Sequence, residues 1–240
     1  MREVSLLGYS FFGGTIEELL ERVEKTIVEG RKLHIITANP EMLVFPDPRF
    51  RKALREAEIR LPDGIGVVWA SRFLGCGTLH RLAGIEVAEA LMERGSVRGW
   101  SFYFLGAREG VVREAVAKLH CRYPRLLVCG FHHGYFTEDE EILEDIRRKC
   151  PNVLFVGMGV PRQEMWIARY QDALPVSVFM GVGGSFDVWA GELKRAPMVF
   201  RRLGLEWLWR VLQEPRRLRR IVPAFFRFGF ALLSEKWWRG

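Results

Sequence analysis

The 240-residue sequence lacks any uninterrupted apolar run of about 18 residues, so it predicts no membrane-spanning helix. Its first residues, MREVSLLGYSFFGG, contain no apolar core of signal-peptide length, and we therefore expect no export. The four cysteines form no C-x-x-C pair and no spacing that is typical of a zinc site. Cysteines scattered singly in this way are typical of reduced thiols in a cytosolic protein.

Several motifs for nucleotides and hydrolysis are also missing. GIGVVW and GVGGSF each lack the third glycine of G-x-G-x-x-G, which weakens the interpretation as a nicotinamide enzyme. There is no G-x-x-x-x-G-K-[ST] loop, no H-E-x-x-H and no G-x-S-x-G. Adjacent histidines do not converge on a metal as an i, i+4 pair on a helix does, so we interpret His132 and His133 as loop or surface residues.

Positive charge is concentrated at one end of the chain. The last forty residues carry ten Lys and Arg against three Asp and Glu, a net charge of +7 that equals the net charge of the whole sequence. Residues 1–200 are therefore neutral. The same forty residues hold four of the eight tryptophans. We therefore expect a core over residues 1–200, followed by a basic, aromatic and helical appendage over residues 201–240.

Short apolar runs alternate with helical patterns along residues 1–200. Buried strands are predicted at 34–38, 101–107, 126–131, 152–159 and 176–184. Helices are predicted at 15–30, 47–58, 108–120, 139–149 and 162–174. The first helix begins with a capping box, Thr15 with Glu18, and closes on Gly30. This alternation predicts an α/β fold that is Rossmann-like, with a largely parallel sheet flanked by helices.

Polar and glycine-rich segments follow the predicted strands. Ligands of parallel sheets bind beyond the carboxyl ends of the strands, and glycine there lets the backbone approach a phosphate or sugar closely. The segments are TANP (37–40), PDG (62–64), LGA (105–107), GMGVP (157–161) and GVGG (181–184). Gly106 and Gly159 are therefore candidates for substrate binding.

Asp63 in the stretch RLPDGIGVVWA has two interpretations. An Asp just before a helix commonly accepts hydrogen bonds from the first free backbone N–H groups, which makes it an N-cap. A carboxylate on a glycine-loosened loop after a strand is also well placed for catalysis. Local sequence alone favours the cap.

Read in order, the segments after the strands resemble those of the WecG/TagA/CpsF family of bacterial glycosyltransferases. The resemblance runs from about residue 3 to residue 220 and rests on TANPEML, AEIRLPDGIGVVWASRFLG, HRLAGIEV, FYFLGA, HHGYF, VLFVGMGVPRQEMWI, GVGGSFDVWAGELKRAP and LGLEWLWRVLQEPRRLRR. The combination of P-D-G-x-G, G-x-P-x-Q-E and G-x-F-D…A-G…K-R-A-P is specific, although each motif alone is weak.

The resemblance implies a Rossmann-like inverting transferase that needs no metal and no other cofactor. Such enzymes move N-acetylmannosamine, or its uronic acid, from a UDP donor onto undecaprenyl-diphosphate-linked N-acetylglucosamine. The product feeds wall teichoic acid or another surface polysaccharide. The sequence leaves open which donor sugar is used and whether the chain forms a homo-oligomer.

An inverting transfer needs a base for the acceptor hydroxyl and positive charge at the departing diphosphate. With the resemblance added, Asp63 becomes the expected base, with the cap still open. Arg81, otherwise a solvated surface arginine, becomes the candidate for the diphosphate. Thr37 and Asn39 are turn and cap residues on one interpretation and hydrogen-bond the sugar or uridine on the other.

Further candidates come from the other matched segments. Gln163 is expected to contact the sugar, whereas Glu164 also suits a helix start on structural grounds alone. Tyr135 is a core residue on pattern alone and a candidate for packing on the uracil in the family context, with Gly134 beside it. Asp187 is a weaker candidate for the nucleoside.

The tail mixes arginine with phenylalanine, leucine and tryptophan. Arg216, Arg220 and Arg227 fall within about 40° on a helix, with Phe225, Phe226, Leu232 and Leu233 largely elsewhere, although Pro223 would kink such a helix. A lipid-linked acceptor favours attachment to an anionic membrane, so we expect a cytoplasmic protein held peripherally at the inner face of the cell membrane. Candidates for the membrane or the acceptor diphosphate are Arg210, Arg216, Arg217 and Arg220.

The alternative from another functional class is a basic nucleic-acid-binding protein on an α/β scaffold, since basic clusters with aromatics also hold phosphates and stack bases. The neutral body argues against it, because a nucleic-acid binder would be expected to spread positive charge along the sheet face. We therefore expect no nucleic-acid partner.

Overall fold

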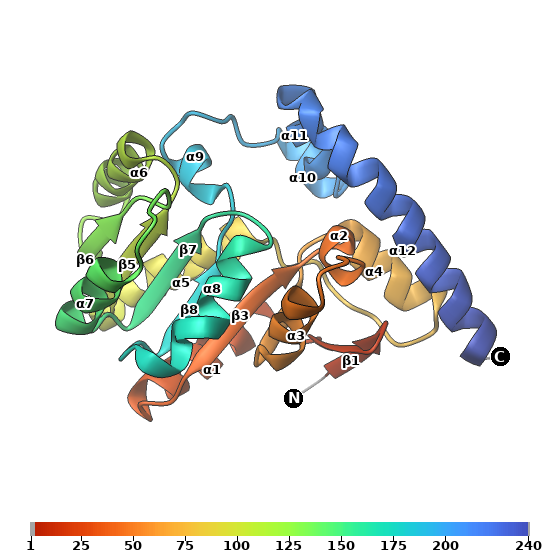
Figure 1. The fold of residues 1–240 in the computed structure, drawn as a ribbon, viewed down its shortest axis with the longest axis horizontal. Helices are drawn as coiled ribbons and strands as arrows, with labels where there is room; N and C mark the ends of the chain where they lie inside the picture. The colour runs from red at the N-terminus through yellow and green to blue at the C-terminus, as the bar shows by residue number, and fades with distance from the viewer. Residues whose placement is uncertain (1–2, 240) are drawn as a thin grey trace.

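A six-stranded sheet forms the centre of the structure, a computed structural model that describes residues 3–239 (Figure 1). Every pair of neighbouring strands in it is parallel. The spatial order is β4 (Ile59–Pro62), β3 (Leu33–Ala38), β8 (Val178–Gly181), β7 (Val153–Gly157), β5 (Ser101–Gly106) and β6 (Leu127–His132). The predicted parallel α/β fold is confirmed.

The strands are apolar throughout because helices cover both faces of the sheet. Along β5, Phe102 and Phe104 belong to the hydrophobic cluster on one face, and Tyr103 and Leu105 belong to the cluster on the other. All four side chains are fully buried. All five predicted strands are present. The run 176–184 ends earlier as a strand, at Gly181, because the chain turns at Gly183 with a φ of +52°.

Each face of the sheet has its own set of helices (Figure 1). One face is covered by α1 (Ile16–Val28), α5 (Gly84–Arg98), α6 (Glu109–Arg122) and α9 (Ser185–Trp189). The other is covered by α2 (Pro40–Leu43), α3 (Pro48–Glu56), α4 (Ile65–Phe73), α7 (Glu140–Lys149) and α8 (Arg162–Tyr170), which continues into η1 (Gln171–Ala173). All five predicted helices are confirmed, and so is the capping box of Thr15 with Glu18.

A short antiparallel hairpin, which the sequence patterns did not predict, lies beside the β4 edge. It consists of β1 (Glu3–Leu6) and β2 (Tyr9–Phe12). Arg60 of β4 holds it, since its Nε donates to the Ser10 carbonyl at 2.5 Å. The hairpin therefore covers an edge that would otherwise expose unpaired backbone groups.

The basic tail folds into α10 (Met198–Arg202), α11 (Glu206–Gln213), η2 (Pro215–Arg217) and α12 (Leu218–Arg239). In Figure 1, α12 extends along the outside of the body toward the C-terminus. It is one helix that continues through Pro223, and it packs against α2. Phe228 is buried in the same cluster as Met42 and Phe50. The helical appendage is confirmed, whereas the division at residue 200 falls inside α10 and stays a prediction.

No helix within residues 3–239 combines the length and apolar character that crossing a membrane requires. The four cysteines are free.

Candidate active site

The sheet has a topological switch point between β5 and β7. The chain leaves β5 toward β6 at the edge, whereas it leaves β7 toward β8 in the opposite direction. The helices that follow these strands, α6 and α8, lie on opposite faces. Open α/β sheets bind ligands in the crevice outside such a point.

Glycines let the backbone segments of this crevice approach closely. A methyl group on Gly106 would lie 2.4 Å from the carbonyl oxygen of Gly157, so only glycine fits there. Gly134 lies against the same point, since a methyl group on it would be 3.0 Å from the Gly106 Cα. Gly159 follows β7 with a φ of +78°. The structure thus brings Gly106 and Gly134 together at the predicted ligand-binding edge.

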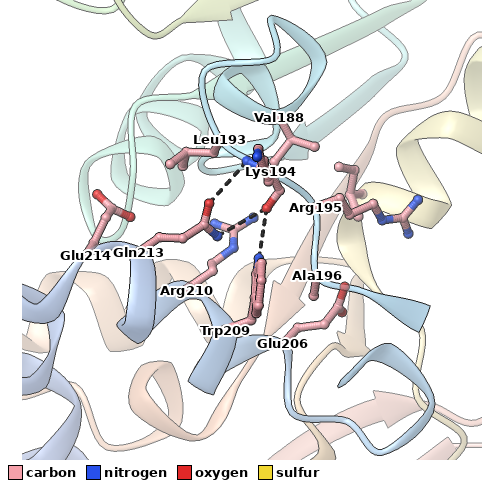
Figure 2. A pocket seen from close by; sticks show the side chains of 11 residues that line it. Val188, Leu193, Lys194, Arg195, Ala196, Glu206, Trp209, Arg210, Gln213 and Glu214 are labelled. Carbon is pink, nitrogen blue, oxygen red and sulfur yellow. Dashed lines mark hydrogen bonds between the residues drawn. The ribbon is translucent and has the colours of Figure 1, made fainter. Parts of the chain in front are cut away.

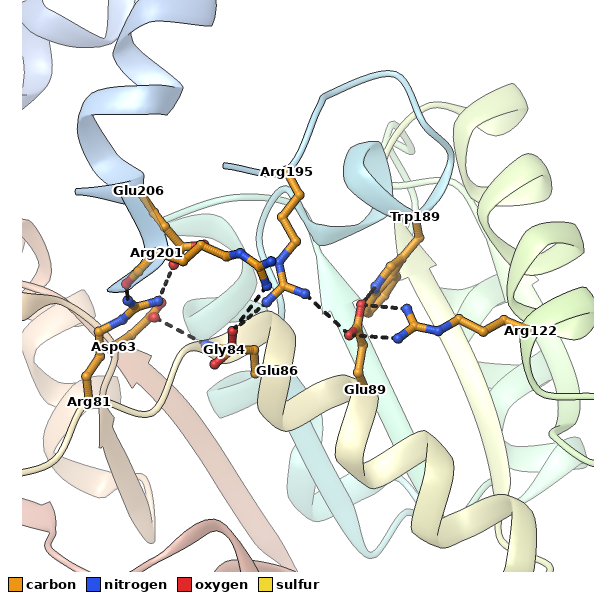
Figure 3. A network of polar contacts seen from close by, with 10 residues as sticks. All are labelled: Asp63, Arg81, Gly84, Glu86, Glu89, Arg122, Trp189, Arg195, Arg201 and Glu206. Atoms are coloured by element: carbon orange, nitrogen blue, oxygen red, sulfur yellow. Dashed lines mark hydrogen bonds and ion pairs between the residues drawn. The ribbon is translucent and has the colours of Figure 1, made fainter. Parts of the chain in front are cut away.

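Asp63 follows β4 and contacts a helix that begins 21 residues later in the sequence. The N-cap of α4, the helix directly after Asp63, is Gly64, and no side chain caps it. The interpretation of Asp63 as the cap of that helix is therefore wrong. Asp63 Oδ1 instead accepts a hydrogen bond from the backbone N–H of Gly84, the first residue of α5, at 3.2 Å (Figure 3).

The surroundings of Asp63 make its carboxyl a weaker acid. Burial raises its pKa to about 6, and the negative charge of Glu206 contributes to the rise. The hydrogen bond from Gly84 and the positive charges of Arg81 and Arg210 oppose it. A carboxylate with a pKa near the working pH is suited to accept a proton in a general-base step.

Thr37 and Asn39 lie beside Asp63 because β3 and β4 are neighbours. Thr37 packs directly under the start of α5, since a methyl group on Gly84 would lie 2.8 Å from its Cγ2. Asn39 caps α2, with its Oδ1 accepting from the Met42 N–H at 3.2 Å. The cap interpretation of Asn39 is thus confirmed, whereas the turn interpretation of Thr37 is wrong because this residue lies within β3. Contacts of either residue with a sugar stay predictions.

Arg81 is already paired with the tail. Its guanidinium forms an ion pair with Glu206 of α11 and donates to the Arg201 carbonyl at 2.8 Å (Figure 3). Glu206 is a residue of this site that the sequence patterns do not indicate. An acid in the aromatic segment LEWLW only weakly indicates a site residue, and nothing in the sequence links it to an arginine 125 residues away. The diphosphate role of Arg81 stays a prediction, and a phosphate there would meet Glu206.

A wider network joins the tail and the 185–196 segment to α5 (Figure 3). Arg195 pairs with Glu86 at 2.6 Å, and Arg201 lies 3.9 Å from the same carboxylate. Glu89 accepts from the Trp189 indole at 3.2 Å and pairs with Arg122. The first two turns of α5 therefore fix the segments that border the site.

A pocket lies between α11, residues 193–196 and the start of α5 (Figure 2). Helix α11 forms its outer wall and is hydrogen-bonded to the backbone of Lys194. The Lys194 carbonyl accepts from Trp209 Nε1 and from Gln213 Nε2, both at 3.1 Å. The tail therefore supplies a wall of this pocket.

Arg210 places an unpaired positive charge in this pocket (Figure 2). Its guanidinium lies over the segment after β8, because a methyl group on Gly184 would be 3.1 Å from Nη1 and 3.5 Å from Asp187 Oδ2. Within residues 3–239 its side chain forms no hydrogen bond and no ion pair.

Acids surround Arg210 without touching it. Burial is the main cause that lowers the pKa of Arg210, and Asp63 and Glu206 oppose the shift. Burial likewise raises the pKa of Asp187, which Arg210 opposes. A guanidinium keeps its charge in such surroundings, so Arg210 can bind a phosphate directly.

The remaining candidates are divided between the surface and the interior. Tyr135 is 72% exposed, so the core interpretation from pattern alone is wrong and its ring is available to a ligand. Gln163 and Glu164 are buried, with 2% and 1% exposure. The Gln163 amide binds groups within the chain, and its contact with a sugar stays a prediction.

The other tail arginines lie outside the pocket. Arg217 pairs with Glu214 at 2.6 Å, and Arg220 pairs with Glu41 of α2 at 2.6 Å. Arg216 is exposed. Their roles at a membrane or a diphosphate stay predictions.

The part of the chain that the structure describes contains no group of three or more His, Cys, Asp or Glu side chains that could hold a metal ion. The expectation of a metal-independent reaction rests on the resemblance alone and stays a prediction.

Comparisons with known proteins show which family this sequence is similar to. The family model described as glycosyl transferase WecG/TagA/CpsF family matches residues 4–240. A protein of Bacillus spizizenii, named N-acetylglucosaminyldiphosphoundecaprenol N-acetyl-beta-D-mannosaminyltransferase, is 34% identical over 88% of this chain and 84% of its own length. A protein of Staphylococcus aureus strain MW2 with the same name is 36% identical over 93% of this chain and 90% of its own.

Proposed function

Because this chain belongs to the glycosyl transferase WecG/TagA/CpsF family, we propose that it transfers N-acetylmannosamine, or its uronic acid, from a UDP donor to undecaprenyl-diphosphate-linked N-acetylglucosamine. The observation that carries the substrates is the activity in the names of two relatives, each matched over more than four fifths of both chains. The transfer would feed wall teichoic acid or another surface polysaccharide.

The reaction inverts the anomeric centre in a single displacement. An acceptor hydroxyl attacks the anomeric carbon of the donor sugar, the new C–O bond forms, and the bond from that carbon to the UDP oxygen breaks. Asp63 takes the hydroxyl proton as the oxygen attacks, and UDP leaves with the bonding electron pair. The position of Asp63 at the end of β4, with a pKa of about 6, supports this role.

The departing diphosphate gains negative charge and needs a cation nearby. Arg210 supports this step best because its guanidinium lies in the pocket with no direct partner within residues 3–239. Arg81 joins it if the phosphate replaces the carboxylate of Glu206. Thr37 and Asn39 bind the sugar beside Asp63, and the exposed ring of Tyr135 packs on the uracil.

We also propose that α12 holds the enzyme at the inner face of the cell membrane. Val222, Phe226, Phe230, Leu233 and Trp237 are exposed and fall within about 80° around the helix, given 100° per residue. Ala224 and Phe228 face the body instead. An exposed apolar stripe on a basic helix is typical of interfacial attachment.

Two residues of the expected apolar face lie outside this stripe, and one of them, Phe225, packs its ring against that of Trp207. Leu232 packs against the cluster that holds α12 to the body, so it is not part of the outward stripe. The apolar residues of α12 therefore form two faces of the helix, one that packs against the body and one that is exposed to solvent.

A transfer assay tests the function. The purified chain is incubated with a short-chain polyprenyl-diphosphate N-acetylglucosamine and each of a set of UDP sugars, and the disaccharide product and UDP are followed by mass spectrometry. The expected result is product with UDP-N-acetylmannosamine or its uronic acid, with the inverted anomer by NMR. No product with either donor contradicts the proposal, and a salt-dependent gel shift in its place favours the nucleic-acid alternative.

A further inference from the structure

Two polar side chains are buried in the first turn of α8, behind the crevice. Gln163 and Glu164 lie next to each other in sequence, and both are almost completely inaccessible to solvent. Polar groups in such positions are costly unless their hydrogen bonds are made. Their partners therefore indicate what they do.

The Gln163 amide oxygen joins two segments of the crevice. Oε1 accepts from the backbone N–H of Gly159 and from that of Gly183, both at 3.1 Å. Gly159 follows β7 and Gly183 follows β8. An amide oxygen has two lone pairs, so these bonds use its full capacity.

Glu164 fixes which way this amide points. Gln163 Nε2 donates to Glu164 Oε1 at 2.7 Å. A flipped amide would place its NH₂ group against the N–H groups of Gly159 and Gly183 and its oxygen against the carboxyl. The carboxyl therefore keeps the amide oxygen on the side of the two segments.

This arrangement is not the most stable way to fill the space. The second carboxyl oxygen, Oε2 of Glu164, is buried and has no hydrogen-bond partner within residues 3–239. An unpaired buried oxygen destabilises a fold, and an apolar side chain of similar volume would avoid that cost. The acid is thus explained by the bond it makes to Gln163.

The neighbouring strand leaves the pair no room to move. A methyl group on Gly181 of β8 would lie 2.5 Å from Gln163 Nε2 and 3.2 Å from Glu164 Oε1. The segment that Gln163 holds continues into Gly184, over which the Arg210 guanidinium lies. The pair therefore supports the backbone beneath Arg210.

We infer that Glu164 is a positioning residue that acts through Gln163, holding the segments after β7 and β8 together so that Arg210 meets the donor diphosphate over a fixed backbone. In this role neither Gln163 nor Glu164 needs to touch the sugar. The link to the donor rests on the proposed function, whereas the link to the two segments does not.

Hydrogen exchange tests the positioning without any substrate. In Glu164→Leu, amide exchange measured by mass spectrometry is expected to rise in peptides covering residues 157–163 and 181–187, with strands β3 and β5 unchanged. Glu164→Gln keeps a carbonyl acceptor for Gln163 and is expected to restore most of the protection. The matched control is Glu109→Gln, the same substitution in the exposed first turn of α6.

A swapped pair separates orientation from packing. Gln163→Glu alone sets two carboxyl groups against each other and is expected to lose protection of both segments. Adding Glu164→Gln restores one donor and one acceptor between the two side chains, while the new carboxylate at position 163 still accepts from both glycines. The double variant is therefore expected to recover the protection that Gln163→Glu alone loses.

Donor kinetics complete the test. For Glu164→Leu the donor KM is expected to rise about ten-fold with a smaller change in kcat, and the swapped pair is expected to bring it back. Unchanged exchange in Glu164→Leu, a uniform rise across all strands, or a swapped pair as poor as Gln163→Glu would overturn the inference. Wild-type protein that transfers no sugar, with the exchange results as expected, contradicts the proposed function alone.

Discussion

Replacing Asp63 with asparagine separates the catalytic use of this carboxyl from its cost to the fold. Asparagine keeps an oxygen that can accept from the Gly84 N–H, now bonded to Oδ1 at 3.2 Å, so the start of α5 is preserved. It removes the carboxylate that the proposed mechanism uses to accept the proton. Turnover is therefore expected to fall by about two to four decades while the fold stays intact.

The same substitution is expected to stabilise the protein at neutral pH. The pKa of Asp63 is about 6 in the fold and 3.8 ordinarily, so the folded state binds the proton more tightly than the unfolded state. Stability from this group is complete below the ordinary pKa and is lost as pH rises through about 6. Two pKa units correspond to roughly 3 kcal/mol for an enclosed group, and partial exposure of Asp63 reduces this to about 1–2 kcal/mol.

Urea unfolding of both proteins between pH 5 and pH 8 measures this difference. The free energy of unfolding of the variant is expected to increase relative to that of the wild type as pH rises. In a separate assay, the wild-type kcat/KM is expected to rise through about pH 6 and then level off. Asp47→Asn is the matched control, and its effect on stability at neutral pH is expected to have the opposite sign. A hydrogen bond and the positive charge from Arg49 lower the pKa of Asp47. Loss of the Asp47 carboxylate is therefore expected to reduce stability at neutral pH and to leave turnover unchanged.

Two results would refute this reasoning. If Asp63→Asn turns over like the wild type at pH 8, Asp63 is not the base. If the variant is less stable than the wild type at pH 8, the carboxylate stabilises the start of α5 more than its burial costs.

Substitutions at three positions, one control substitution and one treatment test the rest of the site and the tail. Arg81→Lys and then Arg81→Ala should raise the donor KM stepwise, and unchanged kinetics in both would exclude a diphosphate contact. Glu206→Gln removes a charge that raises the pKa of Asp63, so the acid limb of the pH–rate profile should move to lower pH. Phe230→Asp, on the outward stripe of α12, should weaken sedimentation with anionic vesicles while turnover on a soluble acceptor persists, and Val28→Asp, an exposed apolar residue of α1, should leave sedimentation unchanged. Dialysis against a chelator should leave turnover unchanged, and recovery only on adding Mg²⁺ or Mn²⁺ would contradict metal independence.

The sequence could predict the sheet because its strands are buried on both faces. Runs such as SFYFLG are apolar at almost every position, and that signal does not depend on what the run contacts. Helix α5 was not predicted, because the signal for its start depends on a contact with a distant residue. Its N-cap is Ala83, which offers no capping side chain, and the acid that meets its first N–H comes from Asp63.

Pairings across the chain were beyond the reach of sequence patterns. Periodicity indicates which face of an element is apolar, but it does not indicate which charge meets which. The partners of Arg81 and Arg220, Glu206 and Glu41, come from distant segments. The candidate residues themselves could be named because they follow strands, where ligands of parallel sheets bind.

The order of the strands determines when this protein can finish folding during its synthesis. β8 lies between β3 and β7 and pairs with both. Before residue 181 leaves the ribosome, the strands can pair only as two separate pieces of sheet, β3 with β4 and β5 with β6 and β7, because the strand that joins them, β8, is absent. Chains fold from the N-terminus as they emerge, and open strand edges promote aggregation. The nascent chain therefore carries two exposed edges until about three quarters of it has left the ribosome, and the segment that closes them also brings the backbone beneath Arg210.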